Sequence, residues 1–378
     1  MKVVNTGNTY QIYDNTLLTY DALPAQAYIV RFSKNMGFFL EKSNDIEVKE
    51  SKIYGIHETK ANKVITSYNI FNKNLGVILS GDKGIGKSLF ARILAQKAID
   101  NNLPVIIVNQ YIAGIADFIE SISQSVMILF DEFDKTFNAG SNKENTAADP
   151  QTSMLSLFDG VSTGKKLFVI TCNETRKLNE YIVNRPGRFH YHFRFDYPEA
   201  EEITMYLQDK VDSKYHDEIA NVVMFSKKVN LNFDCLRAIA FELNLGVPFK
   251  EAIKDLNIIN TEPQSYNIYA VFNNESKLKH SNVSIDLFDN DHEYDYTLYN
   301  NTSSDIGRVS FTVKDCIYKP ELDKYIVEKE NIEWEFYSYY WEDTNLDERP
   351  DIKYWKENIP EYLIISKVPN HNTIHYMV

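Results

Sequence analysis

The 378-residue sequence is poor in cysteine and has no long hydrophobic run. Its three cysteines, Cys172, Cys235 and Cys316, are widely separated and lack the spacing of a metal site, so we expect reduced thiols. No apolar stretch reaches transmembrane length, and the residues after Met1 lack the basic-then-apolar pattern of a signal peptide. These absences predict a cytoplasmic protein without a membrane partner. The cytoplasm would be that of a host cell if the protein is encoded by a virus.

Basic residues are scarce in the last third of the chain. Residues 261–378 contain eleven Lys and Arg against twenty-two Asp and Glu, a net charge of -11, while the whole chain carries -13 and residues 1–260 therefore only -2. An acidic domain repels phosphate backbones. The charge argues against nucleic-acid binding by the C-terminal part and leaves the first 260 residues undecided.

The length predicts two or three domains, and the residue patterns place their boundaries. Short alternating or apolar runs predict a small β-rich region over residues 1–45. In residues 46–200, strand-like apolar runs alternate with helix-like segments, which predicts an α/β fold with a parallel sheet. Helical periodicity predicts a helical subdomain over 201–259, and a period of two predicts an acidic β domain over 260–378.

The segment Gly81–Ser88 fits the phosphate-loop pattern G-x-x-x-x-G-K-[ST] and lies between a strand-like run and a helix-like run. Gly84 and Gly86 allow backbone N–H groups to face phosphates, and the N-terminus of the next helix adds positive potential. Lys87 is expected to reach the β- and γ-phosphates, and Ser88 to bind Mg²⁺. The predicted nucleotide-binding residues of this loop are Asp82, Lys83, Gly84, Ile85, Gly86, Lys87, Ser88 and Leu89.

Polar residues follow two further strand-like runs. Asp131 and Glu132 come directly after the apolar run 126–130, where Asp131 would bind Mg²⁺ and Glu132 would act as general base on the attacking water. Asn173 ends the run that begins at Leu167, and strand ends of a parallel sheet gather around the ligand. Asn173 could therefore contact the γ-phosphate or the water, although a lone Asn is more often a turn or capping residue.

Two arginines flank a Pro-Gly turn in Asn184–Phe189, an arrangement that presents guanidinium groups outward. Arg185 and Arg188 are candidates for arginines that stabilise phosphoryl transfer in a neighbouring subunit. The alternative is an ordinary pair of surface ion-pairing residues.

In order along the chain, these motifs resemble the AAA+ ATPases, and within them the classical AAA clade, with some likeness to mitochondrial chaperones that assemble respiratory complexes. The resemblance covers residues 46–258. It includes the phosphate loop, the acidic strand end 127–134, and the run 154–161, which is similar to the family's "LLNxLDG" helix. It continues through the Asn173 strand and the "RPGRF" of 185–189.

The resemblance implies a P-loop AAA+ parallel-sheet core with a helical lid, in addition to the two β regions. It implies ATP and Mg²⁺ as ligands, Asp131 and Glu132 as Walker B residues, and Asn173 as sensor 1. It also implies that Arg185 and Arg188 act in trans as arginine fingers, that Tyr54 and Gly55 lie against adenine, and that the chain forms a homo-oligomeric ring, commonly a hexamer.

Three parts of the resemblance leave alternatives open. Arg237 is a candidate sensor 2 residue or a solvated helix arginine. Tyr111 and Ile112 resemble a pore loop that grips polypeptide, but Tyr111 could equally pack in the core. The polar stretch 138–151 is a second channel-facing loop or a surface loop.

The favoured function is a ring-forming ATPase that hydrolyses Mg-ATP to remodel or translocate a protein substrate or assembly, with the acidic β domain as the recognition module. The main alternative is an AAA+ nucleic-acid motor or loader in DNA replication or packaging, and a weaker one is a nucleotide-dependent scaffold with little turnover. The motor or loader needs a basic channel, to which Lys135, Lys143, Lys165 and Lys166 could contribute. In the β domain, the aromatic cluster 334–341 predicts a partner-binding surface or ordinary strand packing.

Overall fold

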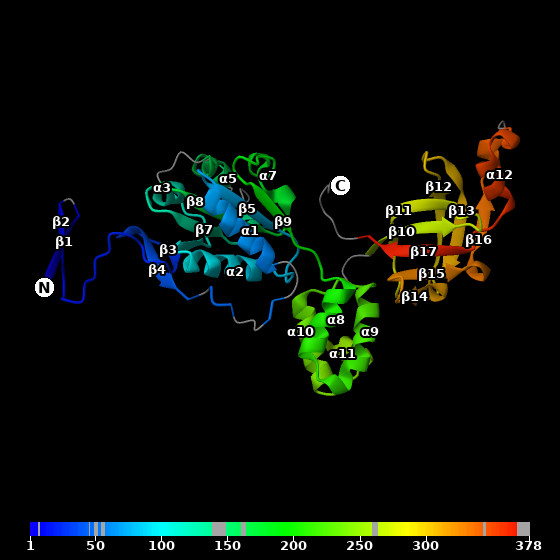
Figure 1. The fold of residues 1–378 in the computed structure, drawn as a ribbon, viewed down its shortest axis with the longest axis horizontal. Helices are drawn as coiled ribbons and strands as arrows, with labels where there is room; N and C mark the ends of the chain where they lie inside the picture. Colours follow the sequence, from blue (N-terminus) through cyan, green and yellow to red (C-terminus); the bar gives the residue numbers. More distant parts are fainter. Residues whose placement is uncertain are drawn as a thin grey trace. The chain divides into compact units, whose positions relative to one another are not determined.

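The computed structural model describes residues 1–6, 8–44, 46–48, 52–53, 57–137, 149–159, 164–258, 264–342 and 345–368. The chain divides into two compact units, Met1–Phe195 and Asp196–Val378 (Figure 1). Among the described residues, no helix has both the length and the apolar character needed to cross a bilayer.

The first unit is built on a seven-stranded sheet with the order β4, β3, β6, β7, β8, β5, β9. Neighbouring strands are parallel except for the antiparallel pair β3 and β4. Every residue of β5, β7 and β8 is buried, as expected for strands covered on both faces. The strands are β3 (Ala27–Ser33), β4 (Gly37–Ser43), β5 (Leu75–Ser80), β6 (Val105–Val108), β7 (Val126–Phe130), β8 (Lys166–Cys172) and β9 (Tyr191–Arg194).

Helices cover both faces of this sheet (Figure 1). Val77 and Leu79 of β5 belong to one hydrophobic cluster with residues of α1 and α2, while Ile78 belongs to a second cluster with residues of α3, α6 and α7. The predicted α/β fold is thereby confirmed. The helices are α1 (His57–Ile70), α2 (Lys87–Asp100), α3 (Ile115–Glu120), α4 (Phe133–Thr136), α5 (Pro150–Ser153), α6 (Leu155–Phe158) and α7 (Glu180–Val183).

The strand order reverses next to β5. The chain leaves β5 through α2 and enters β6, which lies beyond β7 and β8, and it later returns to place β9 on the other side of β5. Parallel sheets bind ligands at such a reversal, beyond the carboxyl ends of the strands. The ends of β5 and β8 therefore mark the expected position of a ligand.

The N-terminal β region is divided between two sheets. β1 (Lys2–Thr6) and β2 (Thr9–Tyr13) form a separate two-stranded sheet. In contrast, β3 pairs in parallel with β6, so that β3 and β4 extend the central sheet.

The second unit combines a group of helices with an eight-stranded antiparallel sheet in the order β14, β15, β17, β10, β11, β12, β13, β16. The helices are α8 (Ala200–Lys210), α9 (Ile219–Ser226), α10 (Phe233–Asn244), α11 (Phe249–Asp255) and, within the β domain, α12 (Pro350–Glu357). The strands are β10 (Gln264–Val271), β11 (Lys277–Ile285), β12 (Glu293–Tyr299), β13 (Asp305–Thr312), β14 (Ile317–Lys319), β15 (Lys324–Glu328), β16 (Glu333–Phe336) and β17 (Tyr362–Lys367).

The C-terminal end of α9 joins the helices to the β domain. The Tyr266 hydroxyl donates to the carbonyl of Lys227 at 3.0 Å, and Lys367 Nζ donates to the carbonyl of Ser226 at 3.0 Å. Lys227 also forms an ion pair with Asp323 at 2.7 Å. Because the last carbonyls of a helix lack partners within the helix, these donors from the β domain both cap α9 and tie the two parts together.

Candidate functional site

The phosphate loop leaves β5 and enters α2 through backbone conformations that require glycine. Gly81 and Gly86 have φ angles of 139° and 96°. A Cβ atom on Gly81 would lie 2.3 Å from the carbonyl oxygen of Phe195, and one on Gly86 would lie 2.9 Å from His57 Nε2. The loop can therefore adopt this conformation only with glycine at these two positions. It leads into a 14-residue helix whose N-terminal amides attract anions.

Lys87 places a cation inside this loop. Its side chain is buried, and Nζ donates to the carbonyls of Gly81 at 2.6 Å and of Asp82, and to Asn173 Oδ1 at 3.0 Å. Burial lowers the pKa of Lys87. A phosphate group would supply the counter-charge that the neutral carbonyls lack. The hydrogen bond from Lys87 to Asn173 also links the loop after β5 to the end of β8.

Thr171 fixes the two acidic residues at the end of β7. Its hydroxyl donates to Asp131 Oδ1 at 2.7 Å and accepts from the backbone N–H of Glu132 at 2.8 Å. Glu132 itself has φ 46° and ψ 49°, a left-handed conformation that costs a non-glycine residue about 1–3 kcal/mol. Such strain is typical of functional sites.

The Glu132 carboxylate is half-exposed and forms an ion pair with Lys135. The hydrogen bond from Lys135 lowers the pKa of Glu132, and the Asn173 amide and the Lys83 ammonium add to this effect. Glu132 is therefore ionised at neutral pH, as a general base must be.

Asp134 is a site residue to which the sequence motif assigned no role. It is 1% exposed, and its Oδ2 accepts from the backbone N–H groups of Asn173 at 3.0 Å and Glu174 at 3.1 Å. Asp134 thus holds the loop that carries Asn173 against the end of β7. Its position in the acidic run 131–134 was the one feature of the sequence that could have indicated this role. Its partners, however, lie about forty residues further along the chain.

The residues at the carboxyl ends of β5, β7 and β8 fit ATP and Mg²⁺. The loop amides and Lys87 are donors for phosphate oxygens, while the exposed Ser88 hydroxyl and the half-buried Asp131 carboxylate are the oxygen ligands that Mg²⁺ prefers. Of the other predicted loop residues, Ile85 is buried, Asp82 and Leu89 are half-buried, and Lys83 is exposed.

The two arginines of the "RPGRF" motif differ in their surroundings. Arg185 is exposed, with its guanidinium 5.9 Å from the centre of the Tyr181 ring. Arg188 is 7% exposed, forms a bidentate ion pair with Asp159, and donates through Nη1 to the carbonyl of Tyr181 at 2.8 Å. The sequence predicted that both guanidinium groups point outward. This is confirmed for Arg185 but wrong for Arg188, which is buried because it pairs with Asp159.

Tyr111 lies at the edge of a hydrophobic cluster. Its ring packs edge-on against Phe137 with a centroid distance of 5.4 Å, and its hydroxyl is 3.5 Å from Ser153 Oγ. Ile112 is half-buried. Within the first unit, the Tyr111 ring therefore makes core contacts, which is the packing alternative considered for this residue.

Arg237 lies in the second unit, on α10, where it is exposed and pairs with Asp234 at 3.2 Å. Tyr54 and Gly55, predicted to contact adenine, lie outside the described residues, as do residues 138–148 of the polar stretch.

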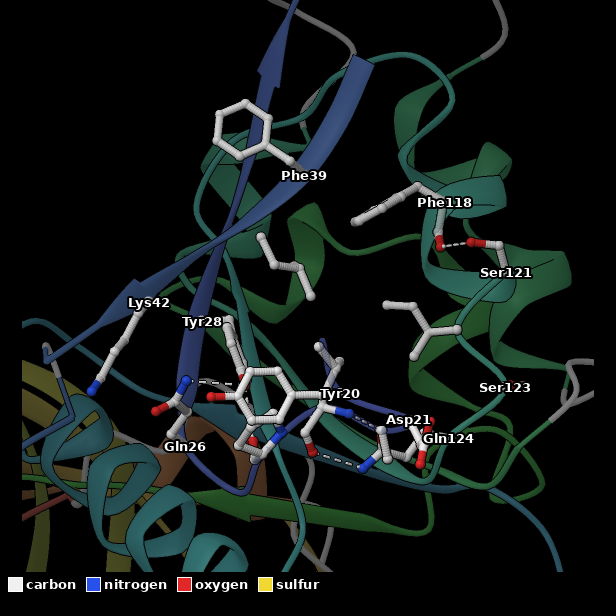
Figure 2. A pocket seen from close by; sticks show the side chains of 15 residues that line it. Tyr20, Asp21, Gln26, Tyr28, Phe39, Lys42, Phe118, Ser121, Ser123 and Gln124 are labelled. Atoms are coloured by element: carbon white, nitrogen blue, oxygen red, sulfur yellow. Dashed lines mark hydrogen bonds between the residues drawn. The ribbon is translucent and has the colours of Figure 1, made fainter. Parts of the chain in front are cut away.

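A separate groove of about 1040 Å³ lies in the first unit, where β4 and the segment around Tyr20 face the end of α3 (Figure 2). Phe39 and Phe118 line it together with polar groups such as Gln26 and Gln124. Its lining contains none of the residues predicted to bind nucleotide.

Comparison with known proteins agrees with this geometry. Residues 77–197 match the family model of the ATPase family associated with various cellular activities (AAA). The chain is 28% identical over 134 residues to a putative cell division cycle ATPase of Plasmodium falciparum, and 27% identical over 137 residues to protein mac-1 of Caenorhabditis elegans.

These alignments cover 32% and 34% of this chain but only 11% and 17% of the two relatives. The matched segment contains the phosphate loop, the acidic end of β7, Asn173 and both arginines. Residues 77–197 therefore form an AAA ATPase domain, and the resemblance of the sequence to the AAA+ ATPases is confirmed.

Proposed function

We propose that the protein is a ring-forming ATPase that hydrolyses Mg-ATP and uses the cycle to remodel or translocate a protein substrate. The observation that carries this proposal is the convergence of Lys87, Glu132 and Asn173 at the carboxyl ends of β5, β7 and β8. Lys87 donates to Asn173, and Asn173 lies close enough to Glu132 to help lower the pKa of its carboxyl group. A hydrolytic site needs a phosphate-binding cation and a base close to each other.

The residues at the ends of β5, β7 and β8 would each have a separate role in hydrolysis. Lys87 and the loop amides would hold the phosphates, and Glu132 would accept a proton from the attacking water. Asn173 would orient that water or the terminal phosphate, with Asp134 fixing its backbone. Bound Mg²⁺, held by Ser88 and Asp131, would neutralise charge on the phosphates.

Ring formation is proposed from the exposure of Arg185. An exposed guanidinium can complete the site of a neighbouring copy, where it stabilises charge on the phosphoryl group during transfer. Arg188 fixes the backbone of Tyr181, whose ring lies beside Arg185, so we assign Arg188 the role of a positioning residue. A closed ring, commonly a hexamer in this family, would repeat this arrangement at each interface.

Three of the four lysines considered for a nucleic-acid channel have partners within their own chain. Lys166 is fully buried, and its ammonium donates to the carbonyls of Ile122, Gln124 and Gly164. Lys165 donates to the carbonyl of Tyr68, and Lys135 is paired with Glu132. Lys143 lies outside the described residues. Three of the four candidate lysines therefore contact groups of their own chain. This favours a protein substrate over nucleic acid.

The test is the stimulation of ATP hydrolysis by candidate substrates. We expect an unfolded protein, such as a reduced and alkylated globular protein, to raise turnover, and DNA to leave it unchanged. Stimulation by DNA that disappears as salt is raised would contradict the proposal, because salt dependence reports contacts with the phosphate backbone.

A further inference from the structure

Three tyrosine rings lie side by side on the β domain, directly after β16. Tyr339 and Tyr340 are 59% and 56% exposed, and their ring centres are 4.2 Å apart. The ring of Tyr337 lies 5.6 Å from the first and 5.9 Å from the second. We refer to Tyr337, Tyr339 and Tyr340 as the tyrosine patch.

Neighbouring contacts hold Tyr337 and Trp341, the residues on either side of Tyr339 and Tyr340, in place. The backbone N–H of Tyr337 donates to the carbonyl of Ile306 at 3.0 Å, and its hydroxyl lies 3.0 Å from Thr297 Oγ1. The short helix η6 (Ser338–Trp341) ends in Trp341, which packs against the hydrophobic cluster of the β domain. Because these contacts already hold the Tyr337 ring, a partner would not have to order that ring on binding.

Carboxylates lie near the patch. Asp305 lies close enough to act on Tyr339, whose pKa is raised to about 12 mainly by its hydrogen bond with Tyr340. Glu335 pairs with Arg308 at 2.8 Å, and both Asp295 and Tyr337 lie near the same guanidinium. We refer to Asp295, Asp305 and Glu335 as the acidic rim; Glu335 is paired with Arg308, and the Arg349 guanidinium lies 5.7 Å from the centre of the Trp341 ring at the end of η6.

We propose that the tyrosine patch and its acidic rim bind a basic segment of a partner polypeptide, one that contains lysine or arginine. The rings offer faces to ammonium and guanidinium groups, and exposed aromatic residues are frequent hot spots of protein interfaces. The rim carboxylates attract the same cations, and the net charge of -11 over residues 261–378 extends this attraction. Single-stranded nucleic acid also stacks on tyrosines, but this charge repels its phosphates. The proposal does not depend on ATP hydrolysis.

The test uses the full-length protein and two fluorescent peptides built from Gly and Ser, one with interspersed Lys and Arg and one with Glu at the same positions. Fluorescence anisotropy should show that the basic peptide binds about tenfold more tightly or better, and that raising the salt weakens it. The double variant Tyr339→Ala/Tyr340→Ala should lose about tenfold in affinity. Asp305→Asn, which keeps the size of the side chain, should weaken binding by a smaller factor.

Leu322→Ala is the matched control. Leu322 is 54% exposed and lies between β14 and β15, at the opposite edge of the sheet from β16, so this variant should bind as the wild type does. The proposal is overturned if both peptides bind equally, or if a single-stranded oligonucleotide binds more tightly than the basic peptide. It is also overturned if both the double variant and Asp305→Asn bind the basic peptide like the wild type.

Discussion

The carboxylate of Glu132 at the end of β7 pairs with the Lys135 ammonium, and Asn173 helps to lower its pKa. Glu132→Gln keeps the shape of the side chain but removes the base, so we expect turnover to fall by about 10²–10⁴-fold while ATP still binds. Phosphate release and titration with a fluorescent ATP analogue measure the two effects. Glu174→Gln, a substitution of the same kind next to Asn173, is the control. Turnover of the Glu132 variant close to that of the control would exclude the base role.

The ion pair with Lys135 predicts a pH effect. The hydrogen bond from Lys135 lowers the pKa of Glu132, and a general base acts in its ionised form, above its pKa. Lys135→Ala should therefore raise that pKa and move the acid limb of the kcat profile to higher pH. Lys177→Ala removes a matching i,i+3 pair with Glu174 and should leave the profile unchanged. An acid limb that stays in place in Lys135→Ala would contradict the prediction.

At the residue scale, the sequence predicts groups whose role follows from a local motif. Lys87, Asp131 and Glu132 belong to this class. Asp134 and Arg188 do not, because each is defined by a distant partner: Asp134 by the backbone of Asn173, and Arg188 by Asp159, 29 residues earlier. No short pattern contains both members of such a pair.

Among the elements, the end of α9 carries the contact between the helices and the β domain. Tyr266 is fully buried and donates to the Lys227 carbonyl, and burial raises its pKa, so the hydroxyl stays protonated. Tyr266→Phe leaves that carbonyl without its donor, and we expect a loss of about 1–2 kcal/mol in the free energy of unfolding. Urea denaturation of the full chain measures it. Tyr362→Phe, at a site 36% exposed, should change stability by less than about 0.5 kcal/mol.

For the strands too, the sequence predicts what depends on neighbouring residues but not what depends on distant ones. The apolar runs 77–80, 126–130 and 167–171 predict β5, β7 and β8 because a buried parallel strand is apolar on both faces. The alternating runs of residues 27–40 predict strands as well, but not that β3 pairs with β6, some eighty residues further on. Pairing between distant strands depends on the whole fold, so the sequence suggested a separate region where the structure has an extension of the central sheet.

On the scale of the whole molecule, the proposed ring places Glu132 and Arg185 of each site on different copies. Glu132→Gln alone and Arg185→Ala alone should both be nearly inactive, the second by about 10³-fold or more. When the two are mixed, an Arg185→Ala subunit keeps its own Glu132 and can receive an intact Arg185 from its neighbour. Random mixing creates this arrangement at about a quarter of the interfaces, so the mixture should recover up to about a quarter of wild-type turnover.

The control for this mixture is the double variant Glu132→Gln/Arg185→Ala mixed with Arg185→Ala. No interface in that mixture combines an intact Glu132 with an intact Arg185, so turnover should stay at the level of the separate variants. If the first mixture also shows only the sum of its parts, Arg185 acts within its own chain or not at all. Recovery in the first mixture alone would require the two residues to meet across a subunit boundary, because neither chain contains both.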